Sequence, residues 1–457
     1  MSSGGTNSSG PDIASGRLSA GQIDANFADL HAPLSRHEAV VAAERCLFCY
    51  DAPCVNACPT GIDIPLFIRQ IANGNAVGAA KTILDANIMG GMCARVCPTE
   101  TLCEEACVRE HAEGKPVEIG RLQRYATDAL FASGKQLYRH GPASGFKVAV
   151  VGAGPAGLAC AHALARSGHA VTIFEARPKG GGLNEYGIAA YKTVDDFAAR
   201  EVSYILDVGN IALLCGVKLG AGVTLAQLRK DYGAVFLGFG LAGVNGLGID
   251  HANVSGVEDA VAFIARLRQA PDKSEIPVGR RIVVIGGGMT AIDIASQTKR
   301  LGAEDVTIAY RRDAAAMKAS AYEQELAQTD GVLIRHWLTP VAILSENGRL
   351  TGVEMEYTAD ENGRLVGTGR RIVLPCDQLF LAIGQSMLAS DLGDGDLALD
   401  SGRIRVDEAR RTSLPGVWAG GDCVAGGQDL TVAGVEYGKQ AALSIDRTLR
   451  SRASAAA

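Results

Sequence analysis

Two short blocks of cysteines constrain this chain more than any other feature. Eight of its twelve cysteines form the patterns Cys46-x2-Cys49-x4-Cys54-x3-Cys58-Pro59 and Cys93-x3-Cys97-Pro98-x4-Cys103-x3-Cys107. Spacings this short let a turn, or one turn of helix, bring several sulfurs to one inorganic centre. A run that closes on Cys-Pro is typical of iron–sulfur proteins in which the last cysteine ligates the other cluster. The pattern predicts two [4Fe-4S] clusters with crossed ligation.

Two other uses of these cysteines are weaker. Structural zinc sites prefer C-x2-C pairs separated by a longer loop, and only Cys46 and Cys49 form such a pair. Disulfides would require an oxidising compartment. The two Cys-Pro steps favour iron over both alternatives.

Composition narrows the class of protein. The 457 residues are enough for about three domains. The chain is 47% hydrophobic and 21% charged, which is ordinary for a globular protein with large cores. A net charge of -6 without a basic block argues against a nucleic-acid partner, and no apolar run is long enough to predict a membrane span. The Ser/Gly-rich start has no signal-peptide pattern, so we expect a cytoplasmic protein with a flexible tail over residues 1–30.

Residues 31–140 are predicted to form a helical domain that holds both clusters. Ser35 and Glu38 have the spacing of a capping box, and the helix that they start runs toward Cys46. Between the cysteine blocks, residues 64–86 carry apolar side chains at helical spacing. This stretch is therefore expected to be a helical scaffold between the two blocks.

The next segment has the pattern of a dinucleotide-binding unit. Residues 147–151 form a valine-rich run, Gly152-Ala153-Gly154-Pro155-Ala156-Gly157 follows, and a predicted helix extends to about Gly168. Residues 171–175 then form a second strand ending in Glu175. The glycines allow close approach of a pyrophosphate, the helix N-terminus attracts it, and Glu175 is placed to accept hydrogen bonds from the ribose.

A second unit of the same kind begins at Arg281. Residues 282–285 form its first strand, residues 286–291 its glycine turn, and residues 306–310 its next strand. This strand ends in Arg311 and Arg312 rather than in an acid, a pair that suits the 2′-phosphate of NADP, with Lys318 close enough in sequence to contribute. The alternative is a solvated pair at the end of a strand.

The first unit is predicted to resume near residue 376. An apolar strand at residues 379–384 is followed by another at 416–422, which ends in Gly421-Asp422. Asp422 is placed to accept from a flavin ribityl chain, and a closing helix over residues 431–449 would direct its N-terminus at the flavin. The predicted fold is α/β: an N-terminal α-helical iron–sulfur domain followed by two nested Rossmann-like (doubly wound) domains. The FAD-binding domain takes residues 146–245 and 376–450, and the NAD(P)-binding domain, residues 246–375, is inserted in it.

These parts make one redox device. A nicotinamide delivers two electrons as hydride, a cluster accepts one electron at a time, and a flavin exchanges electrons in both ways. No Ser/His/Asp or paired-carboxylate constellation stands out, so no catalytic side chain is predicted. The four remaining cysteines (160, 215, 376 and 423) are scattered, which argues against a disulfide reductase.

The cysteine spacing, residues 47–54 and residues 152–156 resemble the N-terminal half of dihydropyrimidine dehydrogenase. The resemblance covers about residues 34–449, and the architecture is shared by the glutamate synthase small subunit. It implies one cluster on Cys46, Cys49, Cys54 and Cys107, and another on Cys58, Cys97, Cys103 and Gln123, with Cys93 unligated. Spacing alone does not choose Gln123 over Cys93. Glutamate synthase subunits carry an acid at the position of Gln123.

The resemblance also implies two sets of cofactor contacts. For FAD they are Val96, Gly152, Ala153, Gly154, Pro155, Ala156, Glu175 and the residues after it through Gly181, Gly182 and Leu183, then Lys192, Leu219, Gly421, Asp422 and the loop to Thr431. For NAD(H) or NADP(H) they are Gly287, Gly288, Met289, Thr290, Arg311, Arg312, Lys318, Ala382, Ile383 and Gly384. Met289 replaces an acid of the long animal-type enzymes, and Lys192 replaces an arginine. The bacterial enzymes of this family use NAD, whereas Arg311 and Arg312 suit NADP. The sequence therefore leaves the choice of coenzyme open.

The function implied by the resemblance is electron input. NAD(P)H would reduce FAD, and two clusters would pass electrons to a PreA-type partner with an FMN-containing (β/α)8 barrel and further iron–sulfur clusters, in a heterotetramer that reduces uracil or thymine to the 5,6-dihydropyrimidine. A barrel alone takes about 250 residues, so it is expected on another polypeptide. The alternatives are a glutamate synthase-type small subunit and a zinc-based interaction module with a bound nucleotide.

Overall fold

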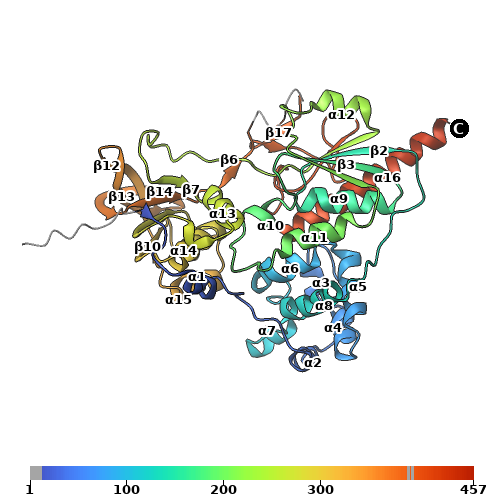
Figure 1. Cartoon of the computed structure of the whole chain (residues 1–457), viewed down its shortest axis with the longest axis horizontal. Coiled ribbons are helices and arrows are strands. Elements are labelled where there is room, and N and C mark those ends of the chain that lie inside the picture. The colour runs from blue at the N-terminus through green and yellow to red at the C-terminus, as the bar shows by residue number, and fades with distance from the viewer. Residues whose placement is uncertain (1–12, 389–391, 393–395, 457) are drawn as a thin grey trace, which may run out of the picture. The chain divides into compact units, whose positions relative to one another are not determined.

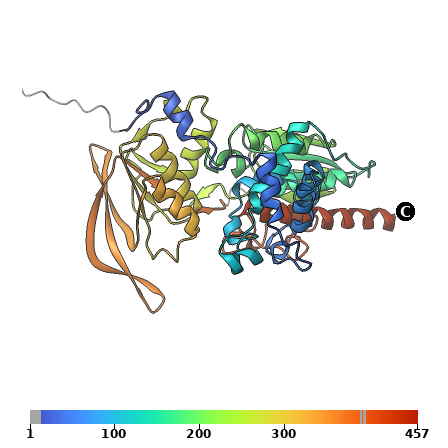
Figure 2. The ribbon, with the colours of Figure 1, turned by 90° about the horizontal axis from the view of Figure 1, so that it is seen from below.

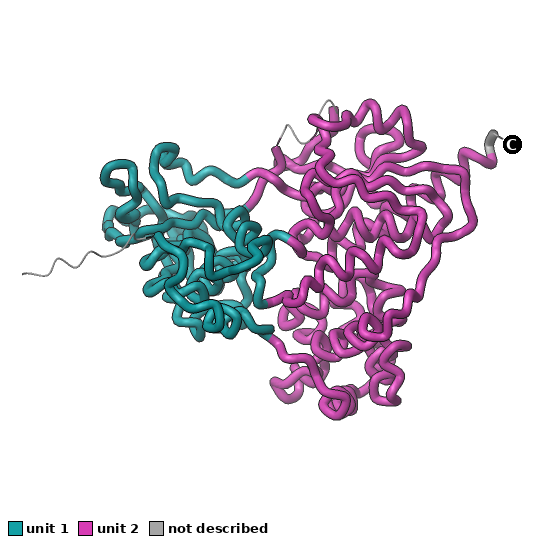
Figure 3. The backbone as a smooth tube through the Cα atoms, viewed as in Figure 1, with its two compact units in different colours: residues 1–30, 186–191, 244–384 teal, residues 31–185, 192–243, 385–457 magenta. Residues whose placement is uncertain are grey.

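The structure is a computed structural model that describes residues 13–388, 392 and 396–456 (Figure 1). It divides into two compact units, coloured separately in Figure 3. Unit 1 takes in Met1–Leu30, Tyr186–Tyr191 and Val244–Gly384, and unit 2 takes in His31–Glu185, Lys192–Gly243 and Gln385–Ala457. Each unit has its own five-stranded sheet.

The cysteine-rich part of unit 2 is helical. Its elements are α2 (Arg36–Glu44), α3 (Pro53–Ala57), α4 (Ile64–Ala72), α5 (Ala76–Ala86), α6 (Gly90–Val96), the 3-10 turn η1 (Thr99–Thr101), α7 (Val108–Glu113) and α8 (Ile119–Ser133). The predicted capping box of Ser35 and Glu38 is present at the start of α2. The predicted scaffold is two helices, because the chain turns at Gly74 with a φ of 75° that favours glycine.

The sheet of unit 2 is parallel throughout. Its strand order is β19 (Val417–Ala419), β5 (Ala234–Leu237), β2 (Lys147–Val151), β3 (Ala170–Glu175) and β4 (Ile211–Cys215). Its helices are α9 (Pro155–Arg166), α10 (Leu183–Tyr186), α11 (Phe197–Leu206), α12 (Leu225–Asp231) and the closing helix α16 (Thr431–Ala456). Helices α9 and α16 lie side by side (Figure 1). A Cβ on Gly438 of α16 would lie 2.0 Å from the carbonyl oxygen of Ala156, so this close packing requires glycine.

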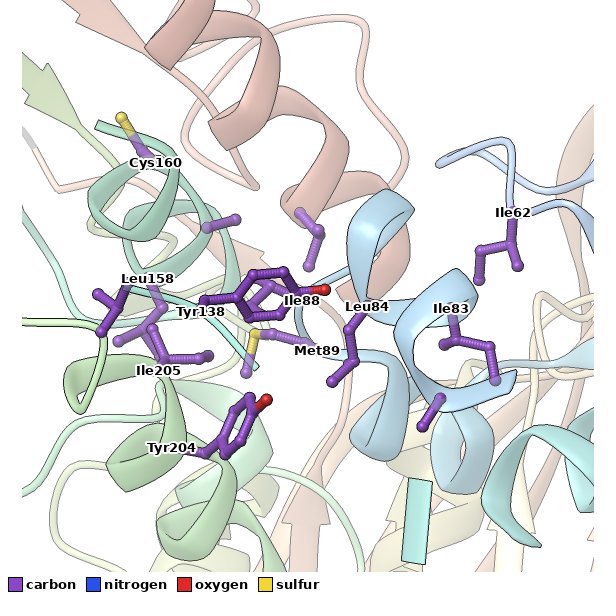
Figure 4. Close-up of a cluster of buried hydrophobic side chains, with 14 of the residues drawn as sticks. Ile62, Ile83, Leu84, Ile88, Met89, Tyr138, Leu158, Cys160, Tyr204 and Ile205 are labelled. Atoms are coloured by element: carbon purple, nitrogen blue, oxygen red, sulfur yellow. The ribbon is translucent and has the colours of Figure 1, made fainter. Parts of the chain in front are cut away.

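One hydrophobic core joins the helical part of unit 2 to its sheet. Figure 4 shows part of this cluster, in which Ile88 and Met89 from the helical part meet Leu158 of α9, Ile205 of α11 and Tyr138 from the connecting segment. All of these side chains are buried. The cysteine-rich helices and the sheet of unit 2 therefore share a packed interior.

The sheet of unit 1 is also parallel. Its order is β11 (Leu333–Arg335), β10 (Asp305–Ala309), β9 (Arg281–Ile285), β15 (Gln378–Leu381) and β7 (Val257–Asp259), with helices α13 (Ala260–Gln269), α14 (Met289–Arg300) and α15 (Ala321–Thr329). An antiparallel sheet of β12 (Leu338–Glu346), β13 (Arg349–Glu361) and β14 (Arg364–Pro375) follows in the chain, seen in orange in Figure 2. The predicted fold class, a helical domain followed by two nested doubly wound domains, is confirmed.

Two predicted boundaries differ from the structure. Residues 376–384 were expected in the flavin domain, but β15 pairs with β9 and β7 in unit 1. A short apolar run suits any buried parallel strand, so its sequence does not select the sheet. The strand adjoins the predicted nicotinamide contacts that follow it.

The predicted tail over residues 1–30 is shorter than expected. Residues 13–14 form β1 (Ile13–Ala14), which pairs with β8 (Val278–Gly279), and α1 (Ala20–Asn26) follows. Ile23 and Phe27 are buried in the core of unit 1. The partners of this segment lie more than 150 residues away in the chain, so local composition gave no sign of them. Among the described residues, no helix is both long and apolar enough to cross a membrane.

Candidate functional site

The first group of cysteines lines a cavity in unit 2. Cys46, Cys49, Cys54 and Cys107 all border it, together with apolar side chains that include Leu47, Ile64, Ile68, Val117 and Ile119. These are the four cysteines that the resemblance assigns to one cluster. Burial, and then the neighbouring sulfurs of Cys46 and Cys107, raises the pKa of the Cys54 thiol to about 12. Such crowded sulfurs suit a cationic inorganic centre, because iron compensates the charge that thiolates would otherwise place in an apolar cavity.

The second group lies deeper. The Cys97 thiol has a pKa raised first by a hydrogen bond with Cys93, then by burial and by the sulfurs of Cys93, Cys103 and Cys58. Burial, followed by the Glu104 carboxylate and the Cys58 sulfur, raises the pKa of Cys103. The structure therefore brings Cys58, Cys97 and Cys103 together, with Cys93 beside them.

Gln123 approaches α6, which carries Cys93 and ends just before Cys97. It lies on α8, is 7% exposed, and its Nε2 donates a 2.7 Å hydrogen bond to the carbonyl oxygen of Gly90 in α6. Within the described part of the chain its Oε1 has no hydrogen-bond partner. The amide is thus held by its nitrogen, and the oxygen is the atom left for a ligand.

Each cysteine group brings at least three thiols to one region of unit 2. No three His, Cys, Asp or Glu side chains among the described residues are arranged to hold one metal ion. A structural zinc gathers its sulfurs at about 2.3 Å from one centre, whereas each thiolate of a [4Fe-4S] cluster binds a different iron atom. The cysteine spacing, with its two Cys-Pro steps, is what favours clusters over zinc.

The first glycine turn has the shape that a bound pyrophosphate needs. Gly152 has a φ of 96°, and a Cβ there would lie 2.5 Å from the carbonyl oxygen of Gly238. A Cβ on Gly157 would lie 1.9 Å from the carbonyl oxygen of Gly152. Helix α9 starts directly after Gly154, so its free amides face the turn. Gly182 closes on Gly154, where a Cβ would lie 2.8 Å from the Gly154 Cα.

Glu175 at the end of β3 holds this turn in place. Its Oε2 accepts a hydrogen bond from the amide of Ala153 at 2.7 Å, and its Oε1 accepts one from the amide of Arg177 at 2.8 Å. Each carboxylate oxygen has a further lone pair, so the predicted contact with a ribose hydroxyl is compatible with both bonds.

The other end of the flavin region carries an unpartnered amide that sequence reasoning missed. Thr431, the first residue of α16, donates a 2.8 Å hydrogen bond to Oδ1 of Asn184. Asn184 is fully buried, and its Nδ2 has no partner in the described part of the chain. Burying such a group is costly, so the site suits a polar ligand. The only sequence signal was the adjacent pair Gly181-Gly182.

Asp422 lies in a similar environment. Burial, with a smaller effect from the Asp429 carboxylate, raises the pKa of Asp422 to about 6, against the influence of Arg403. The other predicted flavin contacts also belong to unit 2. Val96 ends α6, Pro155 and Ala156 open α9, and Leu183 opens α10, while Lys192, Leu219 and Gly421 lie in loops.

In unit 1, the second glycine turn faces the end of β15. A Cβ on Gly286 would lie 2.3 Å from the carbonyl oxygen of Ala382, and one on Gly287 would lie 2.4 Å from the ring of Tyr310. Gly288 caps α14, which begins with Met289 and Thr290. Since β15 and β9 are paired, the predicted contacts at residues 287–290 and 382–384 lie at the same edge of this sheet.

Three cations follow β10 of unit 1 without acidic partners. Arg311, Arg312 and Lys318 are exposed, and within the described residues none forms an ion pair. The backbone of the arginine pair is fixed, because Thr358 donates to the carbonyl oxygen of Arg311 at 2.7 Å and the amide of Trp337 donates to that of Arg312 at 3.2 Å. The backbone of the arginine pair is therefore fixed, while the charged ends of all three side chains remain available. A phosphate site requires this combination.

Sequence reasoning also missed a contact between the flavin part and the cluster-bearing helix. Glu201 of α11 is fully buried, and its Oε1 accepts hydrogen bonds from the amides of Gly91 at 2.8 Å and Met92 at 3.1 Å. Helix α6 has no side-chain cap of its own, so Glu201 supplies one from a distant helix. Arg95 of α6 packs over the Phe197 ring of α11, with 3.5 Å between the guanidinium carbon and the ring centroid.

The stability of the protein should depend on pH through Glu201. Burial raises the pKa of Glu201 to about 8 from an ordinary 4.5, against the effects of the Gly91 and Met92 amides and of Arg95. The folded state therefore binds this proton more tightly than the unfolded state. The stabilisation of the folded state by protonated Glu201 is complete below pH 4.5 and is lost as the pH rises through about 8. The expected slope is at most about 1.4 kcal/mol per pH unit.

Glu201→Gln isolates this effect. Chemical denaturation at several pH values between about 5 and 9 gives the free energy of unfolding. This free energy should depend less on pH in E201Q than in the wild type. Glu201→Ala should cost about 1–3 kcal/mol near pH 5, because it leaves buried amides without an acceptor, and this cost should shrink as the pH rises. An unchanged pH profile in E201Q would contradict the assignment.

Comparisons with known proteins agree with this geometry. The family model described as dihydropyrimidine dehydrogenase domain II, 4Fe-4S cluster, matches residues 23–135, and that described as pyridine nucleotide-disulphide oxidoreductase matches residues 146–438. The chain is 36% identical over 414 residues to the NAD-dependent dihydropyrimidine dehydrogenase subunit PreT of Salmonella typhimurium, covering 90% of this chain and 94% of that protein. It is 35% identical to the glutamate synthase [NADPH] small chain of Escherichia coli, covering 91% and 92%.

Solved structures agree at the level of the fold. FprA of Mycobacterium tuberculosis in complex with NADPH matches with a TM-score of 0.58 and 18% identity, covering 69% of this chain and 86% of that one. The thioredoxin reductase of T. acidophilum matches with a TM-score of 0.53 and 22% identity, covering 66% and 98%.

The fold, the cysteine groups and the glycine turns together define an FAD- and iron–sulfur-dependent NAD(P)H oxidoreductase. The chain belongs to the family that contains the PreT subunits of dihydropyrimidine dehydrogenase and the glutamate synthase small chains. The predicted resemblance is confirmed.

Proposed function

We propose that this chain is the electron-input subunit of a dihydropyrimidine dehydrogenase, acting in pyrimidine catabolism in the cytoplasm. It would take electrons from NAD(P)H and supply them to a PreA-type partner that reduces uracil or thymine. The observation that carries the choice is Gln123, which is held against α6, the helix of Cys93, and whose Oε1 has no hydrogen-bond partner among the described residues. The 36% identity to PreT over 90% of the chain supports it.

Each group of residues has a separate task. Bound FAD supplies the conversion between two-electron hydride transfer and one-electron transfer. The turn at residues 152–157 and the N-terminus of α9 bind its pyrophosphate, and Glu175 binds its ribose. Asn184 and Asp422 offer polar groups to the flavin end. Two [4Fe-4S] clusters take the cysteine groups, with Gln123 as the one ligand that is not a thiolate.

The two cluster sites differ in exposure, which suggests a direction. Helix α6, which carries Cys93 and ends just before Cys97, packs against α11 and α16 of the flavin part. The cavity of the first group is bordered by Leu47, which is 54% exposed, and Tyr50 next to Cys49 is fully exposed. The second cysteine group would then hold the cluster nearer the flavin, and the first group the cluster nearer the partner. Exposed apolar side chains beside the first group suit a protein partner.

The partner completes the reaction. We expect it to carry FMN in a (β/α)8 barrel and further iron–sulfur clusters, and to form a heterotetramer with this chain. The three unpaired cations Arg311, Arg312 and Lys318 favour NADPH as the electron donor, although the PreT relatives are named as NAD-dependent.

Anaerobic purification with the native partner tests the proposal. The complex should oxidise NADPH only when uracil or thymine is present, whereas the isolated chain should reduce artificial acceptors and leave uracil unchanged. Uracil reduction by the isolated chain would contradict the assignment.

A glutamate synthase-type small subunit is the second candidate, supported by the 35% identity to the E. coli protein. It predicts co-purification with a glutamine amidotransferase and NADPH oxidation that depends on glutamine. Gln123 in place of an acid favours the first candidate.

A further inference from the structure

A threonine hydroxyl lies against one sulfur of the second cysteine group. The Oγ1 of Thr60 is 3.3 Å from the Sγ of Cys58, and Thr60 is buried at 6% exposure. Thr60 follows Cys58-Pro59 at the end of α3, so a short turn returns its hydroxyl to the sulfur two residues earlier. No cofactor contact was predicted for Thr60, and the redox scheme above does not use it.

The chemistry of the sulfur sets the direction of this hydrogen bond. As a thiol, Cys58 could donate or accept. As a cluster ligand it is a thiolate without a proton, so the hydroxyl of Thr60 must donate. A hydrogen bond to a ligand sulfur stabilises negative charge on the cluster, and the reduced cluster carries one more negative charge than the oxidised one. The bond therefore favours the reduced form.

A lysine from the flavin part holds the same turn. Lys439 of α16 donates from Nζ to the carbonyl oxygen of Ala86 at 2.9 Å and to that of Thr60 at 3.5 Å. Its Nζ also lies 2.6 Å from Oε2 of Glu436, one turn earlier on α16. Ala86 is the last residue of α5, so Lys439 joins the helix that closes the flavin sheet to two backbone points of the cluster region.

We propose that Thr60 is a positioning residue that raises the reduction potential of the second cluster through an O–H···S bond to Cys58, and that Lys439 keeps its turn in place. The proposal rests on the part of the proposed function that makes Cys58 a cluster ligand. It does not depend on the partner or on the pyrimidine.

The test compares Thr60→Val, which keeps the shape but removes the donor, with Thr60→Ser, which keeps the donor. Each purified chain, loaded with its cofactors under anaerobic conditions, is titrated electrochemically while the reduced clusters are followed by electron paramagnetic resonance. In T60V, one cluster should change its ratio of oxidised to reduced form about tenfold at fixed potential, a shift of about 59 mV to lower potential. The other cluster should stay unchanged, and T60S should match the wild type.

Two results would overturn the proposal: a wild-type potential in T60V with full iron content, or equal shifts in T60S and T60V. If T60V does not retain iron, Thr60→Ala against T60S makes the same comparison. Lys439→Met should shift the same cluster to lower potential, and Lys439→Arg should shift it less. A chain that shows these potentials but supports no uracil reduction with any partner would sink the proposed function and leave this inference standing.

Discussion

Cys54→Ser is expected to remove the first of the two proposed clusters, and with it electron delivery to the proposed partner. Cys54 borders the cavity together with Cys46, Cys49 and Cys107, and a serine oxygen is a harder, less basic ligand than a thiolate when it keeps its proton. The variant should contain about half of the wild-type iron. Partner-dependent activity should fall by more than the roughly 10–100-fold that loss of an outer-shell contact costs.

The same variant should still reduce a small artificial acceptor with NAD(P)H, because that reaction needs the flavin and not the first cluster. Iron content, the visible spectrum and the two activities measure the outcome. Cys215→Ser is the matched control, since Cys215 is exposed and lies in β4 outside both cysteine groups. Equal loss of both activities in C54S, with FAD retained, would contradict the order of the two clusters.

Replacing Arg311 and Arg312 by glutamine will raise the KM for NADPH far more than that for NADH. Each guanidinium bound to a phosphate contributes about 1.5–3 kcal/mol, so losing both should raise the KM for NADPH by about 100-fold or more. NADH lacks the 2′-phosphate, and its KM should change by less than about threefold. Steady-state kinetics with an artificial acceptor measures both values in the isolated chain.

Arg364 provides the control. It opens β14 in the same unit, is exposed, and is separated in sequence from the glycine turn, so Arg364→Gln should leave both coenzymes unaffected. Parallel increases in the KM for NADH and NADPH in the double variant would assign the pair a general role in nucleotide binding. If neither KM changes, Arg311 and Arg312 are a solvated pair at the end of a strand, which was the alternative interpretation of the sequence.

The parts of the fold that sequence predicted are those whose determinants are local. The unit from β2 through α9 to β3 could be read directly, because the valine-rich strand, the glycine turn and the terminal Glu175 are contiguous. The capping box of α2 was equally local. The sheet that β15 joins was not, since it is decided by pairing with a strand almost 100 residues away.

The site shows the same division. Cysteine spacing predicted a metal framework, but the division of ligands between two clusters and the choice of Gln123 came from the resemblance. In the structure α8 brings Gln123 against α6, and no short-range pattern marks that contact. Glu201 and Asn184 were missed because each acquires its role from residues far away in the chain. A lone acid or amide in a sequence gives no sign of such partners.

The shared core of unit 2 affects how the protein folds and acquires its cofactors. Ile88 and Met89 pack in the same interior as Leu158 and Ile205. The cysteine-rich region is therefore part of a larger folding unit and not an independently folding domain. Cutting the chain near residue 140 would expose a hydrophobic surface on each of the two fragments. Maturation is therefore expected to be cooperative: delivery of iron to the helices and capture of flavin by the sheet each favour the fold that the other requires.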